Sequence, residues 1–329
     1  MKIFDGLGQL PSKDELRDEL SDGSGVFVIR NAYTNTALLD RVERTFYGRI
    51  GRQTNQSADH FAAGSNQRVW NAVNKLATDA PEDFIEYYGN PWLHLACEAW
   101  LGPLYQLTAQ VNVVVPGGQA QTGHRDYHLG FFPSDLAKQL PPAMHAASPW
   151  LTLQGAIVHC DTPVEMGPTQ FVLGSQNDPD GYLTYRDESE QARFEKDATQ
   201  SPLCKGDLVF FNPAIFHAAG ENRTQTPRLV NLLQVSSGLA KPMEDLDFHT
   251  MVEQIHPYLG LADPALASNA VKVITDCYPF PSNLDLDPPS EDWLGQTDAN
   301  WLMQRLDENT TIVARQYKER LERRQYRSE

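Results

Sequence analysis

The sequence predicts a mainly β domain with flanking helices. Strand patterns dominate residues 104–235, while apolar residues at helical spacing precede this stretch and helical patterns return after residue 243. Side chains alternate between two faces along a strand and recur every three or four positions along a helix, so the two patterns differ in sequence. Their order predicts one β-rich unit between helical segments.

Four elements are predicted before residue 104. Residues 12–15 (Ser-Lys-Asp-Glu) have the form of a capping box, which predicts a short helix that ends near residue 22. Residues 25–30 predict a strand, and residues 38–50 keep helical spacing. Residues 91–103 predict another helix, with Pro in its first turn and Gly-Pro at its end.

Residues 107–115 predict a strand with one polar face. Alternation places Gln110 and Asn112 on one face and Val111, Val113 and Val115 on the other. Amides that face the inside of a barrel would need a ligand to satisfy them. A solvent-exposed sheet face would explain them as well.

Two longer segments lie outside the strand pattern. Residues 177–200 form a polar insertion, which predicts either a lid or a surface excursion. Helical and loop patterns occupy the end of the chain. We predict a jelly-roll domain with N-terminal helices over residues 1–240 and a helical extension over residues 241–329 packed on it. A homodimer contact through this extension is the alternative.

A His-x-Asp pair lies near the middle of the chain, at His124 and Asp126. On an extended strand, side chains two positions apart share a face, so both can bind one ion while Arg125 points away. His217 follows 93 positions later (217 − 124), after a predicted apolar strand. Two imidazoles and one carboxylate, with the opposite positions open, are the ligand set of non-heme iron(II) sites.

Arg228 follows His217 by eleven positions (228 − 217) and begins another strand-like run. A buried arginine needs an anion, because an unpaired charge in a closed pocket is costly. Its planar guanidinium suits a carboxylate in bidentate geometry. A dicarboxylic co-substrate would supply that anion.

Four blocks carry a resemblance to a known family. They are the His124-x-Asp126 pair, residues 167–175 (Gly-Pro-Thr-Gln-Phe-Val-Leu-Gly-Ser), residues 206–211 (Gly-Asp-Leu-Val-Phe-Phe) ahead of His217, and Arg228. Over roughly residues 25–237 the chain resembles the phytanoyl-CoA dioxygenase family of iron(II)- and 2-oxoglutarate-dependent oxygenases. The resemblance implies a double-stranded β-helix, a cupin-like jelly roll, with helices on one side.

The second block departs from the usual family pattern, Asn-Gly-x-x-x-x-x-Pro-Gly-Ser-His. This chain has Met166 before the first Gly, Leu173 before Gly174, and Gln176 after Ser175. These departures concern the identity of the substrate more than metal binding.

The resemblance also implies ligand roles. His124, Asp126 and His217 would bind Fe(II), and Arg228 would pair with the far carboxylate of 2-oxoglutarate. Thr169 would reach the co-substrate with its hydroxyl, although its β-propensity explains its presence equally well. Gln110 and Asn112 are further candidates for contacts with the co-substrate.

The implied reaction consumes O2 and 2-oxoglutarate and releases succinate and CO2. It would oxidise a C–H bond of a small organic substrate, with hydroxylation expected and desaturation, cyclisation or epimerisation as other outcomes. A secondary metabolite is one candidate substrate, beside an amino-acid derivative or a lipid chain. Halogenation is disfavoured, because Asp126 keeps the carboxylate that halogenating relatives replace with a small residue.

Aromatic residues and a third imidazole close to the ligands predict a substrate pocket formed by Tyr127, His128, Phe131 and Phe216. His128 is close enough in sequence to be a fourth ligand candidate. Because a facial site must leave positions open, we expect it to line the pocket instead.

Two alternatives use the same residues. A zinc-dependent hydrolase could bind its metal with the same His-Asp-His set and would need an acid or base, for which Asp161 and Glu165 are weak candidates. A non-catalytic jelly-roll module would bind metal or ligand without turnover and predicts the loss of a ligand, yet none is lost. The hydrolase leaves Arg228 and residues 167–169 without a role.

Composition narrows the choice of partners. The net charge of −16 (27 − 43) and a pI near 4.9 disfavour nucleic acid and a highly anionic substrate. The four cysteines form no C-x-x-C pair. Residues 1–8 lack the apolar region of a signal peptide and no stretch has the length of a membrane span, so we expect a cytoplasmic protein with a small-molecule substrate.

Overall fold

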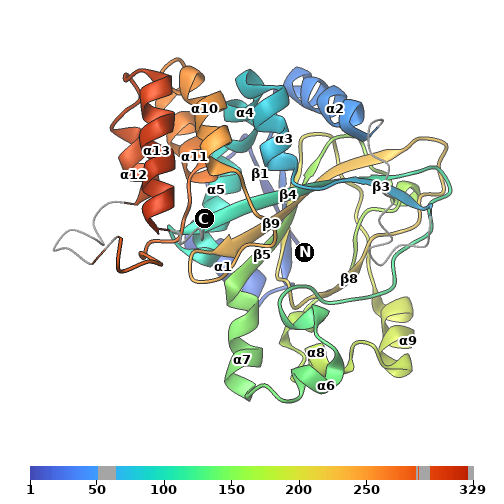
Figure 1. Cartoon of the computed structure of the whole chain (residues 1–329). Helices are drawn as coiled ribbons and strands as arrows, with labels where there is room; N and C mark the ends of the chain where they lie inside the picture. The colour runs from blue at the N-terminus through green and yellow to red at the C-terminus, as the bar shows by residue number, and fades with distance from the viewer. Residues whose placement is uncertain (51–63, 287, 289–296, 325–329) are drawn as a thin grey trace.

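The computed structural model describes residues 1–50, 64–286, 288 and 297–324. A seven-stranded sheet forms its centre (Figure 1). β1 runs parallel to β2, and the other neighbours are antiparallel. The strands, in spatial order, are β1 (Lys2–Asp5), β2 (Val26–Arg30), β7 (Leu208–Phe211), β5 (Thr152–Val158), β9 (Arg228–Ser237), β4 (Tyr105–Val114) and β3 (Asn66–Val69).

A second, small sheet faces part of the large one. It consists of β6 (Gln170–Val172) and β8 (Phe216–Ala218), which are antiparallel. An isolated bridge joins His124 to His217 on β8. The two sheets form the jelly roll that the sequence resemblance implies, and the fold prediction is confirmed.

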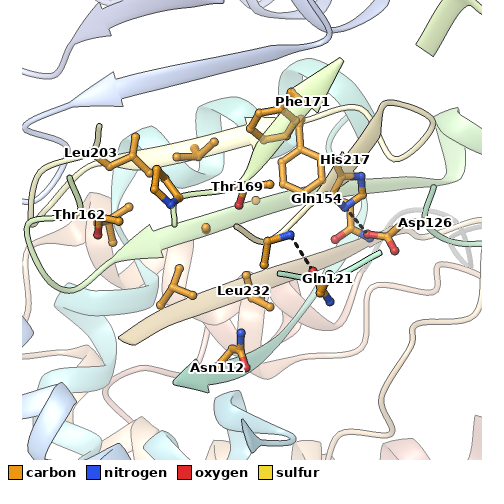
Figure 2. Close-up of a pocket in the computed structure, with 18 of the residues that line it drawn as sticks. Asn112, Gln121, Asp126, Gln154, Thr162, Thr169, Phe171, Leu203, His217 and Leu232 are labelled. Atoms are coloured by element: carbon orange, nitrogen blue, oxygen red, sulfur yellow. Dashed lines mark hydrogen bonds and ion pairs between the residues drawn. The ribbon is translucent and has the colours of Figure 1, made fainter. Parts of the chain in front are cut away.

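The two faces of the large sheet have different surroundings because side chains alternate along each strand. On β5 and β9 one set of alternate residues lines a cavity between the sheets, including Gln154, Ala156, Leu232 and Gln234. Figure 2 shows several of these side chains around the cavity. The intervening residues, such as Leu233, belong to the main hydrophobic core.

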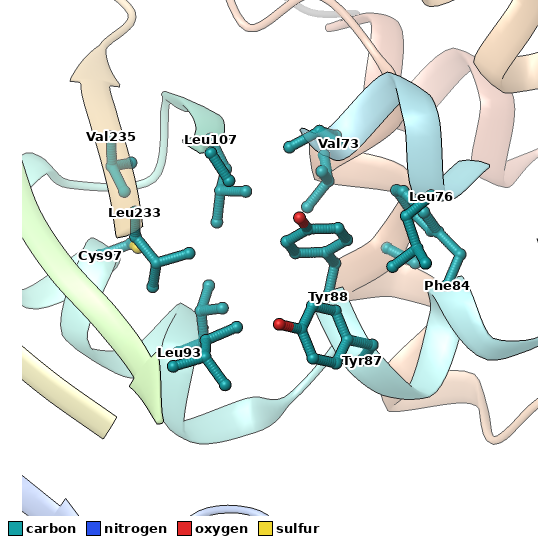
Figure 3. Packing of buried hydrophobic residues seen from close by; sticks show 14 of the residues in the cluster. Val73, Leu76, Phe84, Tyr87, Tyr88, Leu93, Cys97, Leu107, Leu233 and Val235 are labelled. Atoms are coloured by element: carbon teal, nitrogen blue, oxygen red, sulfur yellow. The ribbon is translucent and has the colours of Figure 1, made fainter. Parts of the chain in front are cut away.

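Helices cover the opposite face of the sheet (Figure 1). Leu107, Leu233 and Val235 of the sheet pack there against Val73 and Tyr88 of the helical layer (Figure 3). The N-terminal helices are α1 (Lys13–Ser21), α2 (Thr36–Ile50), α3 (Ala72–Asp79), α4 (Pro81–Tyr88) and α5 (Pro91–Leu101).

The helices that follow β9 share this core. Met251, Val271 and Tyr317 are fully buried in it, and the ring of Tyr317 stacks on Trp301 at 5.7 Å. The described helices of this segment, for which packing on the domain or a dimer contact is predicted, thus contribute to the main core. Its helices are α10 (Phe248–Leu259), α11 (Pro264–Ile274), α12 (Asp298–Met303) and α13 (Thr310–Arg324).

Several local predictions are confirmed. Ser12 and Glu15 form the capping box of α1, and the Asn90 side chain caps α5 ahead of Pro91. The predicted strand at residues 25–30 is β2. Among the described residues, no helix is both long and apolar enough to cross a membrane.

The insertion at residues 177–200 is mostly helical. It contains α8 (Gly181–Thr184) and α9 (Glu188–Asp197) and ends where Thr199 bridges to Phe171 of β6. The remaining short elements lie between β4 and this insertion. They are η1 (Leu129–Phe131), α6 (Ser134–Ala137), α7 (Pro142–Ala147), η2 (Ser148–Leu151), η3 (Val164–Met166) and η4 (Ser175–Asn177).

Candidate metal and co-substrate site

His124, Asp126 and His217 converge at one end of the cavity. Their ligand atoms lie within 4.8 Å of one another. His217 Nε2 is 3.4 Å from Asp126 Oδ2 (Figure 2). His124 Nε2 is 3.8 Å from Asp126 Oδ1. The backbone bridge between His124 and His217, with N–O distances of 2.9 and 3.0 Å, brings residues 93 positions apart together.

Backbone carbonyls fix the tautomer of both imidazoles. His124 Nδ1 is 2.9 Å from the carbonyl oxygen of Thr122, and His217 Nδ1 is 2.9 Å from that of Ile215. A carbonyl can only accept a hydrogen bond, so each Nδ1 carries the proton and each Nε2 presents a lone pair. Two Nε2 lone pairs facing one carboxylate fit a divalent metal ion.

Arg125 lies between the two ligands of the His-x-Asp segment, and its side chain bonds to residues outside the cavity lining. Its guanidinium is buried and donates to the carbonyl oxygens of Ser175 and Ala214 and, at 2.7 Å, to Asp178 Oδ2. Burial lowers the pKa of Arg125, and the Asp178 carboxylate opposes this shift. A Cβ on Gly181 would lie 2.5 Å from Arg125 Cζ, so only glycine leaves room for the guanidinium there.

Arg228, at the start of β9, brings a cation into the same cavity. It is 5% exposed, and burial lowers its pKa to about 10. Across the described part of the chain no carboxylate pairs with its guanidinium, and its Nε is buried without a hydrogen-bond partner. A buried cation in this state fits the far carboxylate of 2-oxoglutarate.

The predicted co-substrate contacts line this cavity of about 480 Å³. Thr169 lies on its wall (Figure 2). Gln110 and Asn112 also reach it, but both are engaged by β3. Gln110 Oε1 accepts from Arg68 at 2.7 Å, and Asn112 Oδ1 accepts from Asn66 at 2.8 Å. The polar face of β4 is therefore inside the fold rather than in solvent.

The predicted substrate residues separate into two groups. Phe131 lines the cavity and is 43% exposed at its rim. Phe216 does not line it, since its side chain is fully buried against Phe194 and Tyr185. Neighbouring strand residues point to opposite faces, so Phe216 must point away from the cavity that His217 faces. We therefore correct the assignment of Phe216 to the pocket.

Tyr127 and His128 also lie outside the lining of this cavity. Their rings contact each other at 4.2 Å, and the backbone carbonyl of Tyr127 accepts a hydrogen bond from Thr152 Oγ1. Both residues lie between Asp126 and η1, where the backbone N–H of His128 donates a hydrogen bond to Ser148 Oγ at 3.3 Å. Their assignment to the substrate pocket therefore stays a prediction from the sequence.

Other cavity residues were not predicted. Arg68 and Gln121 line the cavity from β3 and from the segment before His124. Gln121 Oε1 accepts from the backbone N–H of Ala219 at 2.9 Å (Figure 2). Gln154 on β5 and Gln234 on β9 also face inward. Alternation of polar with apolar residues, which indicated that Gln110 faces one side of its strand, could also have indicated that Gln154 and Gln234 face the cavity.

The residues proposed for a hydrolase are elsewhere. Asp161 and Glu165 are exposed and do not line the cavity. Asp126 is the one carboxylate among the described residues that line it. The described cavity therefore contains no second carboxylate that could act as an acid or base.

A jelly roll with a facial His-Asp-His set and a buried arginine defines a non-heme iron- and 2-oxoglutarate-dependent enzyme. The chain belongs to the phytanoyl-CoA dioxygenase (PhyH) family, whose profile matches residues 21–230. His124, Asp126 and His217 are the residues of this chain that fit the iron of such enzymes, and Arg228 is the residue that fits 2-oxoglutarate.

A fungal protein is similar to this chain in sequence. The iron/alpha-ketoglutarate-dependent dioxygenase ausU of Aspergillus calidoustus is 28% identical over 211 residues. The match covers 63% of this chain and 64% of the relative, slightly under two thirds of that protein's length.

Solved structures share the fold. The carbocyclase SnoK from nogalamycin biosynthesis matches with a TM-score of 0.52 at 15% identity, covering 73% of this chain and 97% of SnoK. The epimerase SnoN, solved with Fe3+, alpha ketoglutarate and nogalamycin RO, gives 0.51 at 17%, with 71% and 90% covered. HygX from Streptomyces hygroscopicus, solved with nickel, 2-oxoglutarate and hygromycin B, gives 0.51 at 14%, with 72% and 92% covered.

Proposed function

We propose that this protein is a dioxygenase that hydroxylates a C–H bond of a small organic molecule, such as a secondary metabolite, and converts 2-oxoglutarate to succinate and CO2. The observation that carries the proposal is the presence, in one cavity, of a buried His-Asp-His cluster whose two imidazoles present their Nε2 lone pairs, and of a buried arginine that no described carboxylate pairs with.

The four site residues would have two roles, metal binding and co-substrate binding. His124, Asp126 and His217 would hold the iron, and Arg228 would fix the far end of 2-oxoglutarate. When bound, the iron and its co-substrate supply the oxidising power by oxidative decarboxylation. The protein positions the target C–H bond and limits access of water, which is how a preorganised cavity raises the rate.

The relatives support small-molecule chemistry without fixing its outcome. The carbocyclase, the epimerase and HygX share this fold at low identity. Hydroxylation is the simplest outcome for a cavity whose described lining contains no carboxylate besides the ligand Asp126. We also propose the cytoplasm as the location and retain a homodimer as a prediction from the sequence.

Succinate formation tests this function. The purified protein is incubated with Fe(II), ascorbate, 2-oxoglutarate and O2, beside His124→Ala and a matched control, His249→Ala, on α10. We expect succinate from the wild type and from His249→Ala but not from His124→Ala. Equal succinate from His124→Ala, or no 2-oxoglutarate binding by a folded wild type that retains zinc, would contradict the proposal.

A further inference from the structure

Gln154 and Gln234 form a pair of amides inside the cavity. They are direct partners in the antiparallel register of β5 and β9, and both line the cavity. Directly opposed residues on one face of a sheet have Cβ atoms about 5 Å apart. The two side chains can therefore contact one ligand group together.

Neither amide is satisfied by the described part of the protein. Gln154 is 2% exposed, and its Nε2 is buried without a hydrogen-bond partner. Gln234 Oε1 is likewise buried without one. A buried polar group that lacks a partner costs about 1–3 kcal/mol, so such groups mark places where a ligand or water is expected. The buried atoms of the pair without a partner are one donor, Gln154 Nε2, and one acceptor, Gln234 Oε1.

The pair lies on the metal side of the cavity. Gln154 is also the register partner of Phe211, whose ring is 4.7 Å from the His217 ring. Figure 2 shows Gln154 beside His217 and Asp126. Arg228 is six residues from Gln234 on the same strand, roughly 20 Å away at 3.3 Å per residue. The glutamine pair and Arg228 therefore lie toward opposite ends of β9.

The surroundings of the pair are mainly apolar. Ala156 and Leu232 follow it along the two strands on the same face. Trp70, Phe131 and Leu173 line the cavity and are each about 40% exposed, at 39%, 43% and 41%. An apolar wall with one donor and one acceptor favours a neutral, mainly apolar molecule that carries an oxygen function.

We propose that Gln154 and Gln234 bind a hydroxyl group of a neutral, mainly apolar substrate and orient that substrate at the metal. The hydroxyl oxygen accepts from Gln154 Nε2, and the hydroxyl proton is donated to Gln234 Oε1. This assignment rests on the proposed function and adds the substrate class to it. The two glutamines are specificity-determining residues and do not take part in the chemical step.

A set of bicyclic probes tests the assignment. Calorimetric titrations use protein loaded with Fe(II) and 2-oxoglutarate without O2, and the probes 2-decalol, its methyl ether and decahydro-2-naphthoate. The ether can accept a hydrogen bond but cannot donate one. We expect the wild type to prefer the alcohol over the ether by about fivefold to tenfold, the range of one neutral hydrogen bond, and to bind the carboxylate least.

Methionine variants separate the two contacts, because methionine keeps the length of glutamine and removes its amide. Gln234→Met should weaken binding of the alcohol alone and abolish the alcohol preference. Gln154→Met should weaken binding of both the alcohol and the ether. Gln67→Met is the matched control, because Gln67 is an exposed strand glutamine on β3, and it should bind like the wild type.

The outcomes distinguish this inference from the function on which it rests. Equal affinity for the alcohol and the ether, or tightest binding of the carboxylate, in wild-type protein that binds 2-oxoglutarate overturns the hydroxyl assignment alone. A preference that persists in Gln234→Met does the same. Failure of the wild type to bind 2-oxoglutarate at all overturns the proposed function as well.

Discussion

Arg228 shows how a single residue links stability to function. Its guanidinium is 5% exposed and its pKa is lowered to about 10 by burial, so the cation is held at a cost to the fold. A ligand that pairs with the buried cation offsets this free-energy cost. The carboxylate of a co-substrate would do so by a charge-assisted, bidentate contact.

Replacing Arg228 with methionine tests this role. We expect the dissociation constant of 2-oxoglutarate, measured by calorimetry on Fe(II)-loaded protein without O2, to rise by about 10-fold to 100-fold, the size of a hydrogen bond to a charged group. Arg223→Met, at an exposed position, is the matched control. The apo variant should also unfold at a higher temperature than the wild type, because a buried unpaired charge is gone.

Unchanged 2-oxoglutarate affinity in Arg228→Met would remove the co-substrate role. A lower unfolding temperature of the apo variant would show instead that the guanidinium stabilises the fold through contacts of its own.

At the scale of elements, Arg125 joins the metal-binding segment to the insertion at residues 177–200. Asp178 accepts from Arg125 at 2.7 Å and from Arg193 of α9 at 2.9 Å. The first arginine is buried and the second is 34% exposed in its side chain. The insertion therefore helps to fix the position of two metal ligands from outside the cavity.

Paired substitutions separate these two contacts. Arg125→Met should lower Fe(II) affinity by about 10-fold to 100-fold, as expected when a residue that orients metal ligands is removed. Arg193→Met removes a contact to the same carboxylate from the surface, where an ion pair contributes about 1 kcal/mol or less, and should leave Fe(II) affinity unchanged. Anaerobic competition titration measures both. Similar losses in the two variants would contradict a specific role for Arg125.

Glu244, in the loop after β9, forms a hydrogen bond with the start of α3. Its Oε1 accepts from the backbone N–H of Asn71 at 2.5 Å, and Met243 beside it lines the cavity. Burial raises the pKa of Glu244 to about 7 from an ordinary value of 4.5, and the backbone hydrogen bonds from Asn71 and Ala109 partly oppose the shift. Between these values the folded state binds more protons than the unfolded state, so this group lowers stability as pH rises from 4.5 to 7.

Glu244→Gln keeps an oxygen for Asn71 and removes the charge. Relative to the wild type, we expect the variant to gain unfolding free energy on going from pH 5 to pH 8, on the order of 2 kcal/mol for a shift of this size. Denaturant unfolding at both pH values measures the gain. Glu253→Gln, at an exposed position on α10, is the control. An equal difference at both pH values would refute the assigned cause.

The sequence was sufficient to predict elements whose signals are local. The His-x-Asp pair needs only extended backbone with a two-residue period, although His124 lies in an isolated bridge and not in a named strand. The cap of α1 needs four residues. Phe216 was misassigned because adjacency in sequence to His217 means the opposite face in a strand. The pairing of Gln154 with Gln234 depends on the register between two strands 80 positions apart (234 − 154), which no local pattern contains.

At the scale of the whole molecule, the large sheet separates two environments. Its helix-covered face forms the main core, to which helices from both ends of the chain contribute, and its other face forms the cavity. Along each strand, one set of alternate residues therefore packs in the core and stabilises the fold, while the other set lines the cavity. This division explains how β5 and β9 can carry buried amides and a buried cation on one face while the other face is mainly apolar, with Asn231 hydrogen-bonded to Tyr87 and Tyr88.

The central claim is that the triad and Arg228 form one site for Fe(II) and 2-oxoglutarate. Chelation of Fe(II) by the keto and carboxylate oxygens of 2-oxoglutarate produces a visible charge-transfer absorption, which can be recorded without O2. We predict this absorption for the wild type, its absence in His124→Ala, and a requirement for much more 2-oxoglutarate in Arg228→Met. A wild-type protein that binds both Fe(II) and 2-oxoglutarate without producing the absorption would contradict the account.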